Sequence, residues 1–249
     1  MDNKNKLVLV TGASKGLGFE IARFLVEKGY DIIIHYHSNE EKIEQLKKEC
    51  EKYGVSIYKY KCDFSSEKDI EQFWESLIKD SCIPDILINN ARMDPYARPA
   101  NFTEGQWWDL IHGVNLKAAY LLTLKCFNSM KKKGWGRVVN ISSTHAFKPS
   151  PLTMISYGSS KAAMQALTRS FAAAGAEFGI TVNTLAPGLI ITESIDKRID
   201  KDTQKRLADN VPLKRGATVT EIAEACAFLL TASYITGETL NINGGVYMP

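Results

Sequence analysis

The chain has 249 residues, of which 45% are hydrophobic and 24% charged, and its formal net charge is +3. This length and apolar content support one large α/β domain with a substantial core, so two independent domains are not expected. The near balance of charges excludes a strong field directed at nucleic acid or at a membrane, and a small soluble substrate is expected instead.

The N-terminal residues 1–6 are polar, and the apolar run at 7–10 is too short for a signal peptide or a membrane span. We therefore expect a cytoplasmic protein. The cysteines are odd in number and widely spaced, with no Cys-x-x-Cys motif and no nearby pair of histidines. They are expected to be reduced, mostly buried small hydrophobes, and no metal site is expected.

Short β-branched runs alternate with stretches of helical period, which is the pattern of repeated βαβ units. Strands are expected at 7–10, 31–36, 56–60, 86–89, 137–141, 181–185 and 239–242. The helical stretches between them carry apolar stripes at Leu17, Ile21 and Leu25, at Ile43, Leu46, Cys50 and Tyr53, and at Ile70, Phe73, Trp74, Leu77 and Ile78. The sequence therefore predicts a doubly wound, mostly parallel sheet of seven strands with helices on both faces.

The second half of the chain contains the longest predicted helices. Thr103, with Gln106 three residues later, fits a capping box, so a long helix should begin there and run through Val114 towards Met130. Further helices are expected over 156–178, between 195 and 208, and from Thr220 to 230, before a turn at Gly244-Gly245.

A glycine-rich turn follows the first predicted strand and leads into the first helix. It reads Thr11-Gly12-Ala13-Ser14-Lys15-Gly16-Leu17-Gly18. Glycine adopts backbone conformations that other residues resist, and it lets a pyrophosphate approach the main chain closely. The free N–H groups and the dipole of the helix start favour an anion. The turn could also be merely a tight loop, but its place between strand and helix favours dinucleotide binding.

Tyr157 and Lys161 are four residues apart, so on a helix their side chains lie on one face. A free tyrosine has a pKa near 10, and proton transfer near neutrality requires roughly 4 kcal/mol of phenolate stabilisation. A nearby ammonium is the obvious means. Taken alone, a Tyr-x-x-x-Lys pair is more often an exposed surface pair, so the rest of the pattern decides between the two interpretations.

That pattern resembles the short-chain dehydrogenase/reductase family from end to end. Its elements are the glycine turn with three residues between the first two glycines, Asp63, Asn89-Asn90-Ala91, Asn115, Ser143, Tyr157-Gly158-Ser159-Ser160-Lys161, and Pro187-Gly188 with Thr192. The resemblance implies a single Rossmann-type NADP-binding domain over residues 1–249, with a substrate loop at about 189–215. It also implies a homotetramer.

The resemblance further implies the catalytic roles. Tyr157 protonates the carbonyl oxygen as hydride arrives from the nicotinamide, and Ser143 hydrogen-bonds that oxygen. Lys161 holds the nicotinamide ribose, and Asn115 positions a water that links the lysine to solvent. Ser142 is a rival to Ser143, but the family usually uses the second serine of such a pair, so Ser142 is expected to be structural.

The end of the second strand indicates which nicotinamide cofactor is used. An acid there would bind the ribose hydroxyls and repel a 2′-phosphate, but Tyr36 takes that place. Lys15 stands where NADP-using relatives commonly carry a basic residue, although it could be a solvated surface charge. NADP is therefore expected. The full set of expected cofactor-binding residues is Gly12, Ser14, Lys15, Gly16, Leu17, Gly18, His37, Ser38, Asp63, Phe64, Asn90, Ala91, Tyr157, Lys161, Pro187, Gly188, Ile190 and Thr192.

Arg92 departs from the family pattern, because glycine usually follows Asn-Asn-Ala. The arginine could face solvent or act as an anion clamp at the substrate mouth. The same mouth is expected to be lined by Met93, Tyr96, His145 and Phe147, with His145 more often a loop histidine than an acid or base.

Three functions remain open. The chain looks closest to the 3-oxoacyl carrier-protein reductases and related polyketide ketoreductases, which implies a ketone or acyl thioester substrate and an acyl carrier protein as partner. Gly134 and Phe178 stand where many such reductases carry arginines, although a basic rim of Arg92, Arg98 and the Lys131–Lys133 run could substitute. The others are a hydroxysteroid or small secondary-alcohol dehydrogenase, and a non-catalytic NADP-binding protein.

Overall fold

The computed structural model describes residues 6–192 and 198–249. Their strands form a parallel sheet in the order β3-β2-β1-β4-β5-β6-β7. The strands are β1 (Leu7–Val10), β2 (Asp31–Tyr36), β3 (Ile57–Lys61), β4 (Ile86–Asn89), β5 (Gly136–Ile141), β6 (Ile180–Pro187) and β7 (Thr239–Ile242). The predicted doubly wound sheet is confirmed, and the third, fifth and sixth strands differ from their predicted bounds by one or two residues.

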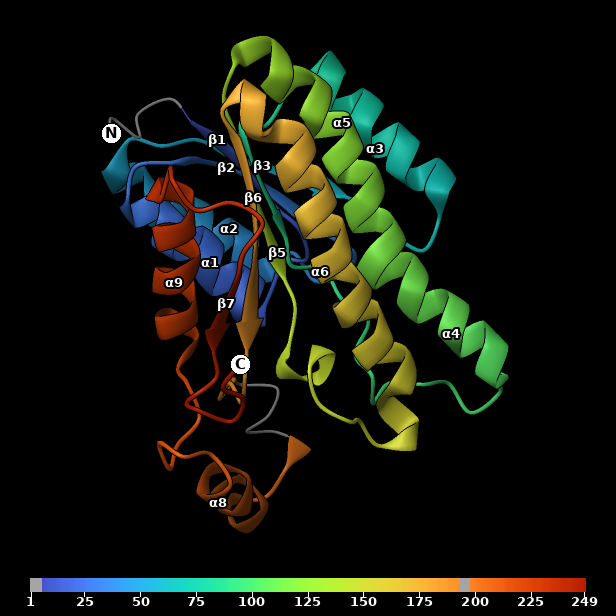
Figure 1. Cartoon of the computed structure of the whole chain (residues 1–249). Helices are drawn as coiled ribbons and strands as arrows, with labels where there is room; N and C mark the ends of the chain where they lie inside the picture. Colours follow the sequence, from blue (N-terminus) through green and yellow to red (C-terminus); the bar gives the residue numbers. More distant parts are fainter. Residues whose placement is uncertain (1–5, 193–197) are drawn as a thin grey trace.

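Helices cover both faces of the sheet (Figure 1). On one face lie α1 (Gly16–Glu27), α2 (Glu41–Cys50) and α9 (Val219–Thr231), and on the other lie α3 (Glu67–Lys79), α5 (Ala118–Lys133) and α6 (Ile155–Gly175). Successive residues of β1 enter different cores, because Val8 and Val10 pack on the first face and Leu9 on the second. All five cysteines are buried with free thiols, as predicted.

The predicted long helix is divided into three parts. Thr103 caps α4 (Glu104–His112) and forms the expected capping box with Gln106. A π-helical turn, η2 (Gly113–Lys117), then leads into α5. Such turns are uncommon within α-helices and occur often at functional sites. Asn115 lies in this turn, so the interruption falls on one of the predicted catalytic residues.

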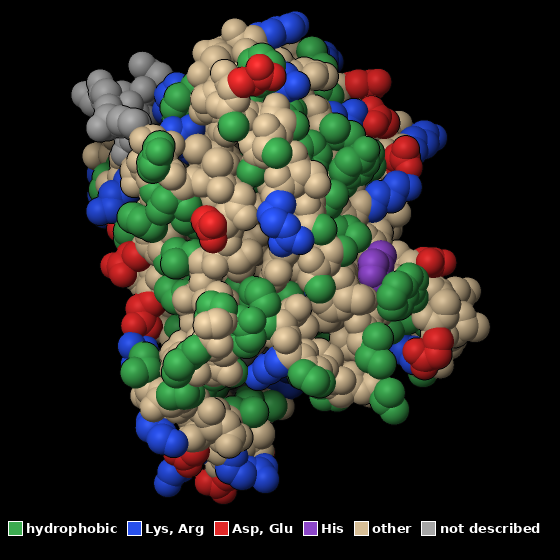
Figure 2. Space-filling view, viewed as in Figure 1, with side chains coloured by type: hydrophobic (Ala, Val, Ile, Leu, Met, Phe, Trp, Pro, Cys, Tyr) green, Lys and Arg blue, Asp and Glu red, His purple; other side chains and the backbone are tan. Residues whose placement is uncertain are grey.

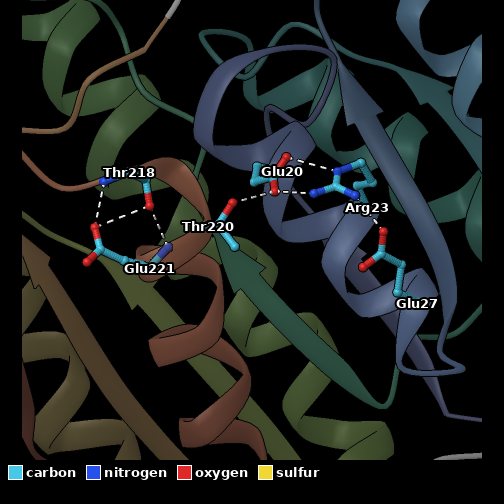
Figure 3. A network of polar contacts seen from close by, with 6 residues as sticks. All are labelled: Glu20, Arg23, Glu27, Thr218, Thr220 and Glu221. Atoms are coloured by element: carbon cyan, nitrogen blue, oxygen red, sulfur yellow. Dashed lines mark hydrogen bonds and ion pairs between the residues drawn. The ribbon is translucent and has the colours of Figure 1, made fainter.

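The last helix begins earlier than predicted. Thr218, not Thr220, is its N-cap, and its hydroxyl accepts a hydrogen bond from the backbone N–H of Glu221. Thr220 instead donates to Glu20 of α1 at 3.0 Å, and Arg23 bonds the same carboxylate (Figure 3). These contacts hold α9 against the helix that follows the glycine turn.

The carboxyl ends of the strands carry the longer connections. The chain moves outward from β1 to β3 and then returns to place β4 beside β1, so the strand order reverses between β1 and β4. Ligands of open α/β sheets bind outside such a reversal. Beyond this edge lies α8 (Lys201–Asp209), the one helix described in the region where short helices were expected. No helix in the described ranges is long and apolar enough to cross a membrane.

Candidate active site

The glycine turn lies at the point where the strand order reverses. Gly12 has φ +63°, and a Cβ built on it would lie 2.9 Å from Cα of Ala91. A Cβ on Gly18 would meet the side-chain amide of Asn90. Gly16 has φ +58°, and a Cβ there would meet nothing within 4 Å. The turn is therefore tight on its inner side and open at Gly16, where α1 begins, which fits a bound pyrophosphate.

Thr11 ties this turn to the end of β4. Its Oγ1 accepts hydrogen bonds from the backbone N–H groups of Asn90 and Ala91, each at 2.9 Å. The Asn90 amide in turn donates to the carbonyl of Thr11 at 2.8 Å. The predicted residues Gly12, Gly18, Asn90 and Ala91 are thus brought together, and Thr11, which was not predicted, is the residue that links them.

Close to the end of β2 lies an acid that was not predicted. Glu40 lies before α2, yet its carboxylate accepts a hydrogen bond from the Tyr36 hydroxyl at 2.5 Å. Next to this pair, His37 lies 4.0 Å from the Asp63 carboxylate, and the Ser14 hydroxyl donates to the Ser38 carbonyl at 3.1 Å. These four residues, which were predicted to bind the cofactor, therefore lie close together beside the end of β2. Lys15 and His37 are exposed there.

Tyr157 and Lys161 lie on one face of α6, as predicted. Both are buried: the phenol is 8% exposed and the lysine 1%. The Lys161 Nζ lies 5.8 Å from the centre of the tyrosine ring and donates a hydrogen bond to the Ile141 carbonyl at 2.7 Å. Ser143 follows β5 and hydrogen-bonds the Tyr157 hydroxyl. Three predicted catalytic side chains are therefore adjacent.

Ser142, which was expected to be structural, makes a hydrogen bond within the fold. Its hydroxyl donates to the Lys161 carbonyl at 2.9 Å and so joins the end of β5 to α6. Gly158 lets α6 pack closely against the segment after β5, because a Cβ there would lie 3.0 Å from the carbonyl oxygen of His145.

Burial governs the titration of both catalytic groups. It raises the pKa of Tyr157, while the Arg92 charge and the hydrogen bond from Ser143 act in the opposite direction. Burial, aided by the Arg92 charge, lowers the pKa of Lys161 to about 7. The lysine is therefore poised near neutrality, and both groups respond to an arginine that stands where the family usually has glycine.

Asn115 connects the loop after β4 to α6. It is completely buried, and its Oδ1 accepts a hydrogen bond from the Met93 N–H at 2.8 Å. Its Nδ2 donates to the Ser160 hydroxyl at 3.1 Å. Asn115 does not face outward, because the π-helical turn places the side chain between these two elements.

An aromatic residue that was not predicted joins those expected to line the substrate mouth. The His145 ring lies 6.1 Å from that of Tyr157, and its Nδ1 lies 3.0 Å from the Ser150 hydroxyl. Phe147 stacks on Tyr247 from the C-terminal tail, with ring centres 4.5 Å apart. Tyr247 was not predicted because it is distant in sequence from every motif.

The loop after β4 contacts the predicted substrate loop. Arg92 lies 3.9 Å from Asp94, and Arg198 of the predicted substrate loop bonds the same aspartate at 2.7 Å. Arg198 also lies over the Tyr96 ring at 4.7 Å. Arg92 is exposed, so it combines a solvent-facing position with an electrostatic effect on Tyr157 and Lys161.

The predicted basic rim is not a single surface. Lys133 bonds Asp85, which precedes β4, whereas Arg92 follows that strand. Lys131 lies over the Phe178 ring, and the two residues lie with Gly134 at the amino ends of the strands. The two groups are far apart because α4 and α5, which lie between them in the chain, lead from the carboxyl end of β4 back to the amino end of β5. Figure 2 shows acidic and basic side chains interspersed on the visible face.

The residues predicted around the end of β6 lie at the start of the predicted substrate loop. Pro187 ends β6, and Gly188 packs against Asn243, since a Cβ there would lie 2.9 Å from the asparagine Cα. Ile190 forms a parallel bridge with Ala217. The substrate loop predicted at 189–215 includes residues 193–197, which lie outside the described residues. Among the described ones, no group of three or more His, Cys, Asp or Glu is arranged to hold a metal ion.

Comparison with known proteins identifies the family. A family model described as enoyl-(acyl carrier protein) reductase matches residues 12–247. The chain belongs to the short-chain dehydrogenase/reductase family. A member of this family is an oxidoreductase that uses a nicotinamide cofactor, and the glycine turn described above fits such a group.

Relatives in the family carry more specific names. A 3-oxoacyl-[acyl-carrier-protein] reductase of Staphylococcus epidermidis is 32% identical over 98% of this short-chain reductase and 100% of its own length. An acetoacetyl-CoA reductase of Rhizobium meliloti is 34% identical, with 98% and 99% covered. The solved structure of acetoin dehydrogenase from Enterobacter cloacae has a TM-score of 0.85 at 29% identity, with 100% of both chains covered.

Proposed function

We propose that this chain is an NADPH-dependent ketoreductase that converts a 3-oxoacyl thioester into the 3-hydroxyacyl product. The observation that carries the proposal is the buried cluster of Tyr157, Ser143 and Lys161 beside a glycine turn of the right shape for a dinucleotide. A protein that only binds a nucleotide needs the turn but not the cluster, so the cluster favours turnover.

The nicotinamide, when bound, supplies the hydride. Tyr157 then donates its phenolic proton to the carbonyl oxygen, and Ser143 donates a hydrogen bond to the same oxygen. Lys161, held at the Ile141 carbonyl, binds the nicotinamide ribose and stabilises the phenolate that remains. Asn115 keeps α6 and the loop after β4 in register through its two hydrogen bonds.

The NADPH preference rests on the charges around the adenosine side. Lys15 and His37 are exposed there and can donate to a 2′-phosphate, while Tyr36 takes the place of the acid that NAD-using relatives need. Glu40 is an acid close to the end of β2, and Tyr36 and Lys59 both engage its carboxylate. These partners reduce its ability to repel a phosphate.

Comparing kcat/KM for NADPH and NADH tests this preference. We expect NADPH to be at least tenfold better, and Lys15→Ala to reduce that ratio without changing kcat/KM for NADH. Tyr36→Asp should reverse the preference. Equal efficiency of the two cofactors in the unmodified protein contradicts the proposal.

The thioester substrate rests on the named relatives, which reduce 3-oxoacyl carrier protein and acetoacetyl-CoA. Acetoin dehydrogenase gives the second candidate, a small free diketone or its secondary alcohol. We assign residues 189–215 to the substrate loop of a single domain. The division of the basic rim removes the electrostatic reason to prefer a carrier protein over coenzyme A, so the thioester itself is the substrate class.

A substrate panel separates the two candidates. Acetoacetyl thioesters of coenzyme A and of a carrier protein, free diketones and a steroid ketone are each supplied with NADPH, and the nicotinamide absorbance is followed. We expect the thioesters to react most efficiently. A kcat/KM at least tenfold higher for a free diketone or the steroid would replace the thioester by that substrate class.

A further inference from the structure

His35 is a buried polar side chain that the catalytic scheme does not use. It is the fifth residue of β2 and is 2% exposed. Its ring stacks on Phe64 with centres 3.7 Å apart and planes 5° apart, and Phe73 meets the ring edge at 5.8 Å. A buried imidazole needs partners for both nitrogens, and the structure supplies them.

One partner is the glycine turn itself. The Gly12 N–H donates a hydrogen bond to Nδ1 of His35 at 3.0 Å, and the next amide, Ala13 N–H, donates to the His35 carbonyl at 3.0 Å. The other ring nitrogen, Nε2, lies 3.1 Å from the Cys62 carbonyl. A carbonyl can only accept, so Nε2 carries the proton and Nδ1 is left as an acceptor for Gly12.

We propose that His35 is a positioning residue for the dinucleotide, which holds Gly12 in its left-handed conformation by accepting its backbone N–H. The inference rests on the proposed function of the glycine turn. Gly12 has φ +63° and touches Ala91, so a small displacement of Gly12 moves the whole turn against the end of β4. His35 also joins the turn to Cys62 and Phe64, immediately before and after the predicted cofactor-binding residue Asp63.

Two substitutions separate the acceptor from the ring. His35→Asn keeps an acceptor, Oδ1, close to the place of Nδ1 and removes most of the ring, whereas His35→Phe keeps the ring on Phe64 and removes both nitrogens. If Gly12 needs the acceptor, the Phe variant leaves a buried N–H unsatisfied. We expect NADPH to bind the Phe variant roughly tenfold or more weakly and the Asn variant within about threefold of the unmodified protein. If His35 only fills space, the opposite order is expected: the Asn variant, which loses most of the ring, would bind NADPH more weakly than the Phe variant.

The measurements are the NADPH dissociation constant by nucleotide fluorescence and, in parallel, KM and kcat. We expect the KM for NADPH to rise in the Phe variant, with kcat at saturation within about threefold of the unmodified value. Phe73→Leu is the matched control, because it disturbs the same aromatic cluster without touching Gly12, and it should leave NADPH affinity within about threefold. If the Phe variant does not fold, His35→Leu takes its place.

The outcomes are distinct. Tight binding by the Phe variant, or equal weakening in both variants, overturns the role of His35 and leaves the proposed function intact. Failure of the unmodified protein to bind NADPH or NADH overturns the proposed function and the inference with it. Nitrogen NMR of histidine-labelled protein gives a second test without substitution: protonated Nε2 supports the inference, and protonated Nδ1 overturns it.

Discussion

The rings of Phe147 and Tyr247 stack with their centres 4.5 Å apart and their planes 9° apart. Phe147 lies four residues beyond Ser143, and Tyr247 belongs to the C-terminal tail, which Asn243 holds through the Tyr247 carbonyl at 3.0 Å. The tail also packs on the end of the substrate loop, where a Cβ on Gly245 would lie 3.1 Å from Pro212. Three distant segments therefore meet beside the predicted substrate mouth.

This contact predicts a specificity defect. Tyr247→Ala removes an aromatic stacking partner, worth about 1 kcal/mol beyond its buried area, and frees the Phe147 ring to move. We expect KM for an acyl thioester to rise about fivefold, with kcat changed less. Steady-state kinetics check this, and Tyr53→Ala on η1 (Glu51–Tyr53), remote from the mouth, is the control. An unchanged KM would show that the aromatic pair does not shape the substrate site.

Arg92 leads to a prediction about pH. Its positive charge lowers the pKa of Tyr157 and of Lys161, although burial is the larger influence on both. Removing the charge by Arg92→Gly, which restores the usual family residue, should raise both pKa values. Ketone reduction needs the protonated phenol, so its rate falls as pH rises through the pKa of the acid. The alkaline limb of the profile of kcat/KM against pH should therefore move to higher pH, and Arg98→Gly is a control that removes an arginine from the same loop.

A shift of that limb to lower pH, or no shift in the Gly variant relative to the control, would show that Arg92 does not act on the catalytic pair.

The elements that the sequence predicted best are those with strong local patterns. The strands follow from β-branched runs, and the capping box at Thr103 is a contact between residues three apart. The start of α9 was misplaced by two residues, although Glu221 stands three residues after Thr218 and completes a capping box there, whereas Thr220 contacts Glu20 instead.

The features that were missed depend on contacts between distant segments. No local pattern shows that Tyr247 reaches Phe147, that His35 accepts from Gly12, or that Asn115 sits in a π-helical turn. The prediction of a basic rim was wrong for the same reason. It treated residues at the two ends of a helical run as neighbours, although the helices separate them.

Because His35 is buried, we expect the free energy of unfolding to depend on pH. Burial lowers its pKa to about 4 from an ordinary value of 6.5. The unfolded chain therefore binds more protons than the folded one between these pH values, and the free energy of unfolding should fall as pH falls through this window. The upper limit of this loss is about 3 kcal/mol.

Urea unfolding at pH 7 and at pH 4.5 measures this loss. The unmodified protein should lose more stability than His35→Asn, which has no imidazole to protonate there. Identical pH dependence in the two proteins would remove His35 as the source of the acid sensitivity.

The family resemblance predicts a homotetramer, and the exposed apolar side chains on α4 and α5 agree with an interface there. Trp108, Tyr120 and Leu124 are each at least 40% exposed. We expect light scattering to give a mass close to four times the 27.7 kDa of the chain. Leu124→Glu should yield a smaller species, because it places a charge in the contact, whereas Ile78→Glu on α3 should not. A stable monomer of the unmodified protein at micromolar concentration contradicts this prediction.

The central claim is that Tyr157 is the proton donor of an NADPH-dependent ketoreductase, and Tyr157→Phe tests it most directly. The substitution removes one oxygen from a buried ring and leaves the glycine turn untouched. The decisive measurement is the rate of NADPH oxidation with the best ketone of the substrate panel, combined with the NADPH dissociation constant of the same preparation. We expect a rate more than about 100-fold lower with the dissociation constant nearly unchanged. A rate within threefold of the unmodified protein would contradict it.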